Sequence, residues 1–183
     1  MDAIELHRPG DWRFDQLDDL PDDGRRYEVV DGLLVVSPPP TFWHQEVSAA
    51  LLRQLAAQAP ADWRVLLELG LPLGTDGRVP DLTVVSARAR RGPGAPLPAP
   101  EHVGLVVEVV SPSSRKTDRF AKPGEYAEAG IPLFWRVETE PDLLVVAHRL
   151  RAGVYEQAAV VDGAGTAPAP WGPVRLDLTR VGS

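Results

Sequence analysis

Cysteine is absent from this chain of 183 residues, and the chain contains only two lysines and one methionine. Without cysteine the protein has no disulfide, no thiol nucleophile and no thiolate metal site. No apolar run is long enough to span a membrane, and the N-terminus lacks the basic stretch and apolar segment of a signal peptide. These absences predict a cytoplasmic protein with no membrane association.

Excess positive charge is also lacking, since the net charge is −7, which argues against a protein that coats nucleic acid non-specifically. The charge is unevenly distributed. Residues 1–31 contain ten acids and four bases, whereas residues 86–122 contain seven bases and three acids. This local basic character is compatible with a polyanion approaching one face of the protein.

The hydrophobic content of 44 % and the length predict a single domain over residues 1–183, with 1–11 and 163–183 peripheral or irregular. Asp31-Gly32 between two short apolar runs predicts an N-terminal β-hairpin, because both positions of a tight hairpin turn need positive φ. Further elements are expected as a helix over 41–59, strands over 63–69, 81–85 and 104–110, a helix over 118–129, and three antiparallel strands within 132–162. This order predicts an α/β (mixed α+β) fold with a central mixed sheet flanked by helices.

Two of these strands carry a single carboxylate within an apolar run, Asp81 in "VPDLTVV" and Glu108 in "GLVVEVV". Burying a charged side chain is costly unless something pairs with it. If the two strands are neighbours, the carboxylates converge at one edge of the sheet, where a divalent cation would relieve their repulsion. Mg²⁺ prefers hard oxygen ligands of this kind, together with water and a substrate phosphate. The pair therefore indicates a metal site suited to phosphodiester hydrolysis.

Lysine is scarce beside seventeen arginines, and both lysines, Lys116 and Lys122, lie shortly after Glu108. An ammonium near the two acids would orient the attacking water or stabilise charge on the phosphate oxygens. Pro123 and Gly124 follow Lys122 directly. Because the residue before a proline disfavours helical backbone, the helix either continues through Lys122 or starts at Pro123 with Lys122 at its mouth, and the second case leaves open whether the ammonium still points at the two acids or is moved out of register.

The segments "RYEVVDGLLVVSPPPTFWHQEV", "VPDLTVV" and "LVVEVVSPSSRKTDRFAKPGEYAEAGIPLFWRV" resemble, in this order, the Uma-two family of restriction-endonuclease-like proteins, within the PD-(D/E)xK nuclease superfamily. The resemblance covers about residues 15–160. It implies a restriction-endonuclease-like fold, a bound Mg²⁺ or Mn²⁺, and hydrolysis of DNA. The superfamily pattern places a lysine two residues after the glutamate, where this chain has Val110.

The resemblance also implies roles for individual residues. Asp81 and Glu108 match the two metal-binding acids, and Val109 the residue whose carbonyl contacts the metal. Lys122 matches the catalytic lysine, which in this family lies on the following helix. Glu28 and His44 match positions that border the site. From their charge and place in the chain, the residues expected to meet DNA phosphates are Arg115, Lys116 and Arg119.

Plainer interpretations stay open beside the nuclease hypothesis. The fold could serve as a non-catalytic module that binds nucleic acid or a protein, with the lysine displaced by Pro123-Gly124. It could also be a metal-free structural protein whose acids are ion-paired with arginines, and Asp81, which follows a proline, could by itself be a turn residue. Glu28 as an ion-paired surface residue and His44 as a core histidine fit either of these. The sequence does not indicate which DNA sequence or structure would be recognised. It also leaves open whether the protein forms a homodimer.

Overall fold

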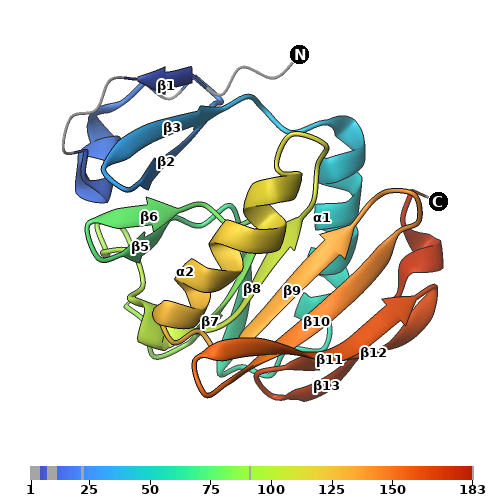
Figure 1. The fold of residues 1–183 in the computed structure, drawn as a ribbon. Helices are drawn as coiled ribbons and strands as arrows, with labels where there is room; N and C mark the ends of the chain where they lie inside the picture. The colour runs from blue at the N-terminus through green and yellow to red at the C-terminus, as the bar shows by residue number, and fades with distance from the viewer. Residues whose placement is uncertain (1–4, 8–11, 22, 91, 183) are drawn as a thin grey trace.

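The computed structural model describes residues 5–7, 12–21, 23–90 and 92–182 (Figure 1). Its centre is a six-stranded sheet with the strand order β11-β10-β9-β8-β7-β4. In chain order, these strands are β4 (Trp63–Leu67), β7 (Leu82–Ser86), β8 (Val103–Val109), β9 (Leu133–Glu138), β10 (Leu144–Arg151) and β11 (Val154–Asp162). All neighbours are antiparallel except β8 and β9, which are parallel. The predicted central mixed sheet is confirmed.

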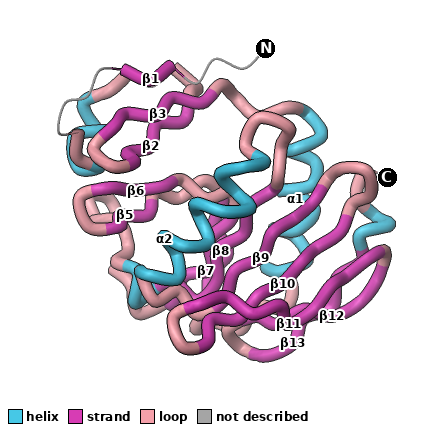
Figure 2. The backbone as a smooth tube through the Cα atoms, in the orientation of Figure 1, coloured by secondary structure: helices cyan, strands magenta, loops and turns pink. Residues whose placement is uncertain are grey.

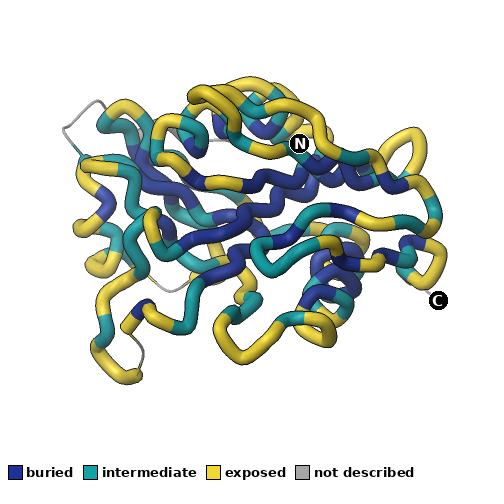
Figure 3. Tube along the Cα trace, turned by 90° about the horizontal axis from the view of Figure 1, so that it is seen from below, coloured by how far each residue is buried: buried dark blue, intermediate teal, exposed yellow. Residues whose placement is uncertain are grey.

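Strand β8 is buried at every residue, as the apolar run predicted for a strand covered on both faces. Figure 3 shows the buried residues concentrated along the central strands. Side chains alternate along β8, so Leu105 and Val107 pack in the core beside α1 (Phe42–Ala56), whereas Val106 packs beside α2 (Lys122–Glu128). The two helices therefore cover opposite faces of the sheet (Figure 2), and Glu108 lies on the face of α2.

Helix α1 begins as the sequence predicted. Thr41 is its N-cap, and the Thr41 hydroxyl accepts a hydrogen bond of 3.3 Å from the backbone N–H of His44. The apolar positions four residues apart face the sheet and are fully buried, namely Val47, Leu51 and Leu55. This packing fixes the first turn of α1, and with it His44, against the edge of the sheet. No helix among the described residues is both long and apolar enough to cross a bilayer.

A second, smaller sheet lies beside the central one, with the order β1-β3-β2-β6-β5. Its strands are β1 (Glu5–His7), β2 (Arg26–Val30), β3 (Leu33–Ser37), β5 (Leu71–Leu73) and β6 (Asp76–Arg78). Strands β2 and β3 form the predicted hairpin, in which Asp31 and Gly32 have φ values of 50° and 70°. The three-residue strands β1, β5 and β6 were not predicted, because so short a segment leaves no periodic pattern.

The expectation that residues 163–183 are irregular was wrong. Strands β12 (Ala164–Ala169) and β13 (Gly172–Asp177) form a hairpin that packs on the central sheet. The prolines of this segment had argued against strands, but a two-stranded hairpin leaves one edge of each strand unpaired and so tolerates them. Of the N-terminal segment predicted to be peripheral, residues 1–4 and 8–11 lie outside the described residues.

Candidate active site

Pairing of β7 with β8 brings the two predicted carboxylates to one cavity. Leu82 lies opposite Val107 in this antiparallel ladder, so continuing the register by one residue places Asp81 opposite Glu108. Both residues line a cavity of about 570 Å³, and their exposed fractions are 2 % and 1 %. Two carboxylates buried this deeply need cationic or hydrogen-bonding partners, and the surrounding elements supply them.

Asp81 is contacted from three directions. Its Oδ1 lies 2.9 Å from Nη1 of Arg26 on β2, and its Oδ2 lies 3.2 Å from Nε2 of His44 on α1. The backbone N–H of Val109 donates to Oδ2 at 2.7 Å. Burial disfavours the charged form of Asp81, but the contact with His44 and the charges of Arg26 and Lys122 outweigh it and lower the pKa to about 2. Asp81 is therefore ionised at neutral pH.

Glu108 has different partners, both on α2. The Lys122 ammonium donates to Oε2 at 2.8 Å and the Tyr126 hydroxyl donates to Oε1 at 2.5 Å. Burial raises the pKa of Glu108, the Lys122 charge opposes the rise, and the neighbouring acids Asp118 and Asp81 add to it, so that the pKa reaches about 8. The pKa values of the two site acids are therefore shifted in opposite directions, down for Asp81 and up for Glu108.

Lys122 reaches Glu108 because helical backbone continues through Pro123, in agreement with the expected helix over 118–129. A π-helical turn, η3 (Thr117–Ala121), runs directly into α2, and the Lys122 N–H donates to the carbonyl of Thr117 five residues earlier. Lys122 has helical backbone angles, with φ −55° and ψ −42°. The π turn widens the helix just before Pro123, so a residue that would interrupt an ordinary α-helical ladder is accommodated.

Asp118 is a third site acid, and it was not predicted from the sequence. Its exposed fraction is 1 %, it lines the same cavity, and its Oδ1 lies 2.9 Å from the Lys122 ammonium. The four-residue spacing to Lys122 is the signal that could have indicated this ion pair. Burial disfavours the Lys122 ammonium, but the charges of Glu108, Glu28 and Asp118 outweigh it and raise its pKa. The lysine is held protonated among three acids.

Glu28 and His44, predicted to border the site, both line the cavity. Glu28 accepts a hydrogen bond of 2.9 Å from the Val79 N–H, and its other oxygen lies 3.4 Å from Nη1 of Arg78. Arg78 is buried and is also held by Glu125 at 2.6 Å, so it ties the small sheet to α2. Nδ1 of His44 is buried and finds no partner within the described part of the chain.

The basic turn predicted to meet phosphates is partly neutralised. Nη2 of Arg115 lies 2.6 Å from Glu140, and Nη2 of Arg119 lies 2.7 Å from Glu138. Lys116 lies on the same turn and is exposed. The structure therefore places all three cations at the protein surface near the cavity, but with less net positive charge than the sequence alone suggested.

The cavity contains carboxylate oxygens that could serve as ligands for a hard divalent cation. Two carboxylates from adjacent strands are the ligand type that Mg²⁺ combines with water and substrate phosphate. Oδ1 of Asp81 is buried and, counting only described residues, accepts no hydrogen bond of good geometry, although Arg26 lies 2.9 Å from it. No cluster of three or more histidine and acidic side chains with the geometry of a metal site occurs in the described ranges. The protein would thus supply few ligands and leave others to water and substrate.

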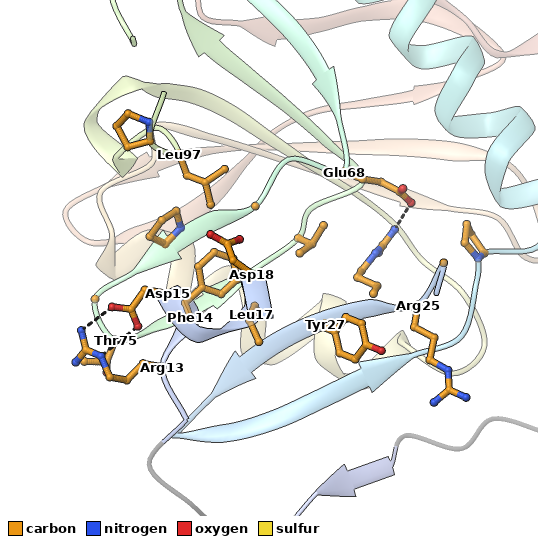
Figure 4. Close-up of a pocket in the computed structure, with 18 residues that line it drawn as sticks. Arg13, Phe14, Asp15, Leu17, Asp18, Arg25, Tyr27, Glu68, Thr75 and Leu97 are labelled. Carbon is orange, nitrogen blue, oxygen red and sulfur yellow. Dashed lines mark hydrogen bonds and ion pairs between the residues drawn. The ribbon is translucent and has the colours of Figure 1, made fainter. Parts of the chain in front are cut away.

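A second cavity of about 680 Å³ shares part of its wall with the first. Figure 4 shows this cavity, with Phe14, Leu17 and Leu97 around it and an ion pair drawn at Glu68. That pair joins Oε1 of Glu68 to Nη2 of Arg26 at 2.7 Å. Arg26 also lines the cavity of the two carboxylates, so its side chain lies between the two spaces.

The fold is that of restriction-endonuclease-like proteins, with a mixed central sheet and buried acids where β7 and β8 meet. The model of the Uma2 family, described as "Putative restriction endonuclease", matches residues 14–177. The chain therefore belongs to the Uma2 family, as the sequence resemblance predicted.

A solved structure shares the architecture. It is described as a "putative nuclease belonging to DUF820" from Anabaena variabilis, and it superposes with a TM-score of 0.67 at 19 % sequence identity. The similarity covers 85 % of this chain and 88 % of that one. No curated protein matches the chain. At this identity the likeness establishes the fold.

Proposed function

We propose that this protein is a metal-dependent endonuclease that hydrolyses DNA phosphodiester bonds. Asp81 and Glu108 would hold Mg²⁺ or Mn²⁺, with the Val109 carbonyl as a further oxygen ligand. One observation carries the proposal: two buried acids from adjacent strands and the ammonium of Lys122 line the same cavity, with Lys122 2.8 Å from Glu108. The Val109 N–H points to Asp81, and the carbonyl of a strand residue projects to the same side as its N–H.

The bound ion and the residues around it would have different roles in hydrolysis. The ion would lower the pKa of a bound water and neutralise charge on the phosphate. Lys122 is held by Glu108 and Asp118 and stays protonated, so it is suited to orient the attacking water or to stabilise charge on the phosphate oxygens. A new bond forms from the water oxygen to phosphorus, and the bond from phosphorus to the leaving ester oxygen breaks. Tyr126 fixes the Glu108 carboxylate throughout.

Two kinds of surface group support DNA as the substrate. Arg115, Lys116 and Arg119 lie at the surface near the cavity and suit phosphate contacts. Phe42 and Phe120 are 81 % and 78 % exposed, and each is next in sequence to a residue that lines the cavity. Exposed aromatic rings offer flat faces on which bases stack.

The test is cleavage of a supercoiled plasmid in Mg²⁺ or Mn²⁺, with EDTA as the metal-free arm. Asp81→Asn and Glu108→Gln are expected to abolish nicking and to remove Mn²⁺ binding measured by calorimetry. Glu156→Gln is the matched control, since Glu156 is exposed on β11 and outside the cavity. Nicking by the Glu108→Gln variant at the wild-type rate would refute the proposal.

A second candidate is a non-catalytic module of the same fold that binds nucleic acid. The observation that favours it is that both acids already have cationic partners, Arg26 for Asp81 and Lys122 for Glu108. In this case the protein is expected to bind DNA oligonucleotides in the presence of EDTA and to leave the plasmid uncut. Calorimetric titration with Mn²⁺ is expected to show no heat of binding. Calorimetry followed by plasmid cleavage on one preparation separates the two candidates.

A further inference from the structure

Arg26 is a half-buried cation of the site that the proposed chemistry does not use. We infer that Arg26 is a resident counter-ion that competes with the divalent metal for Asp81, and that Glu68 holds Arg26 when it yields that carboxylate. The inference rests on the proposed function, because it concerns the metal that Asp81 would bind. Arg26 is therefore a positioning residue that sets metal affinity.

Arg26 contacts two acids at once, Asp81 and Glu68, so it can leave one of them and stay paired with the other. Nη1 lies 2.9 Å from Oδ1 of Asp81, and Nη2 lies 2.7 Å from Oε1 of Glu68. The exposed fractions of the three side chains rise in order, with Asp81 at 3 %, Arg26 at 18 % and Glu68 at 44 %. One guanidinium thus bridges an acid deep in the catalytic cavity and an acid near the surface.

Competition follows from charge and from the oxygen that Arg26 contacts. Oδ2 of Asp81 already accepts the Val109 N–H and faces His44, so Oδ1 is the carboxylate oxygen with no hydrogen bond among the described residues. A metal ion that uses Asp81 meets the guanidinium at that oxygen, and two cations on one oxygen repel each other.

Arginine keeps its proton throughout the accessible pH range, so it cannot relieve this repulsion by deprotonation and has to move. Glu68 offers a second anion that Arg26 already contacts, which keeps the displaced charge paired. The larger cavity on the far side of Arg26 provides space for the side chain. When a metal displaces Arg26 from Asp81, the protein loses the ion pair between these two residues. The Arg26 charge stays paired with Glu68, so no buried charge is left without a partner.

Calorimetric titration of Mn²⁺ into apo protein, without DNA, tests the inference. Arg26→Met keeps an unbranched apolar side chain and removes the guanidinium charge, and it is expected to tighten Mn²⁺ binding on the order of tenfold. Arg64→Met is the matched control, because Arg64 is half-buried, bonds only to the carbonyls of Ser86 and Ala89 among its described hydrogen bonds, and lies outside this cavity. The control is expected to bind Mn²⁺ within about twofold of the wild-type affinity.

Glu68→Gln supplies a second arm that does not depend on the stability of the arginine variant. It is expected to weaken Mn²⁺ binding severalfold in the wild-type background, because Arg26 then has one fewer anion to accept it. In the Arg26→Met background the same change is expected to have little effect, since the two residues act through each other. If Arg26 had only a structural role, its removal would weaken Mn²⁺ binding. The inference expects the opposite, namely tighter Mn²⁺ binding by Arg26→Met.

The outcomes separate this inference from the proposed function. Wild-type protein that binds Mn²⁺, with Arg26→Met binding equally or more weakly, would overturn the inference and leave the nuclease proposal intact. Mn²⁺ binding by Arg26→Met alone would support the inference strongly. An absence of Mn²⁺ binding by both proteins, with normal thermal unfolding, would overturn both. Equal effects of Glu68→Gln in both backgrounds would overturn the role given to Glu68.

Discussion

The Lys122 ammonium lies 2.8 Å from Oε2 of Glu108, although the two residues are 14 positions apart and belong to different elements. In the superfamily pattern the lysine follows the acid on the same strand, at the position that Val110 occupies here. In this protein α2 delivers the ammonium to the carboxylate from above the sheet. A lysine on a helix packed against β8 thus reaches a strand carboxylate that lies far from it in the sequence.

Replacing Lys122 by methionine is expected to lower the free energy of unfolding by about 3–5 kcal/mol, because Asp118 loses its buried counter-charge and Glu108 loses a hydrogen-bond donor. Lys116→Met removes the other lysine of the chain, which is exposed, and is expected to change stability by less than about 0.5 kcal/mol. Urea denaturation at pH 7.5 measures both. Equal stabilities of the two variants would show that the Lys122 ion pairs contribute nothing.

Tyr126→Phe removes the hydroxyl that donates to Glu108 and is expected to cost about 1–3 kcal/mol of stability and to weaken Mn²⁺ binding. Tyr155→Phe is the matched control, since the Tyr155 hydroxyl donates to the carbonyl of Ile131, away from the cavity. Both changes remove one hydrogen bond, but only the first touches a site acid. A Mn²⁺ affinity that responds equally to both would argue that Tyr126 has no part in holding Glu108.

Mn²⁺ affinity is expected to rise with pH up to about 8. The pKa of Glu108 is raised to about 8, chiefly by burial, so at neutral pH the metal has to displace a proton from this carboxyl. Calorimetry at pH 7 in two buffers with different ionisation enthalpies measures the proton released. Affinity that stays flat between pH 6 and pH 8, with no proton release, would contradict the raised pKa.

Asp81 is expected to contribute to stability with the opposite dependence on pH. Its pKa is lowered from 3.8 to about 2 because its contacts with His44, Arg26 and Lys122 outweigh the effect of burial. A lowered folded-state pKa gives stability that is present above the unfolded value and is lost as the pH falls through the folded value. Asp81→Asn is therefore expected to be about 2 kcal/mol less stable at pH 7, with the gap closing between about pH 4 and pH 2.

Urea denaturation of wild-type protein and Asp81→Asn at pH 7 and at pH 3 measures this gap. Asp162→Asn, at an exposed end of β11, is the control, and its difference from the wild type is expected to be small at both values. A gap for Asp81→Asn that widens on acidification would mean that the ion pair with Arg26 does not stabilise the folded protein.

DNA binding is expected to depend on the surface cations according to their pairing. Lys116→Ala is expected to reduce the slope of log affinity against log salt by about one, the effect of one lost phosphate contact. Arg119→Ala is expected to reduce it less, because Glu138 already neutralises that guanidinium. Fluorescence anisotropy with a labelled oligonucleotide in EDTA over a range of salt measures the slopes. A larger effect at Arg119 would show that DNA displaces Glu138.

Local signals predicted much of the fold. The Asp31-Gly32 turn, the Thr41 cap and the buried run of β8 depend on the chemistry of a few consecutive residues, so they could be deduced without tertiary information. The C-terminal hairpin was missed because its prolines suggested irregular chain. The helix expected over 118–129 is present as η3 and α2, but the π turn that accommodates Pro123 was not predicted, because no sequence rule identifies such a turn in advance.

Two of the acids in the site could be deduced from local sequence, since single carboxylates in the apolar strands of Asp81 and Glu108 have few uses other than binding a cation or a cationic side chain. The partners of those acids come from elements far away in the chain: Arg26 lies on the small sheet, and Asp118 and Tyr126 lie on the helical segment that crosses β8. The difference lies in the distance along the chain over which each effect acts. Strand alternation and turn chemistry act between neighbours in the chain, whereas the electrostatic environment of a buried acid is set by whichever distant elements pack against it.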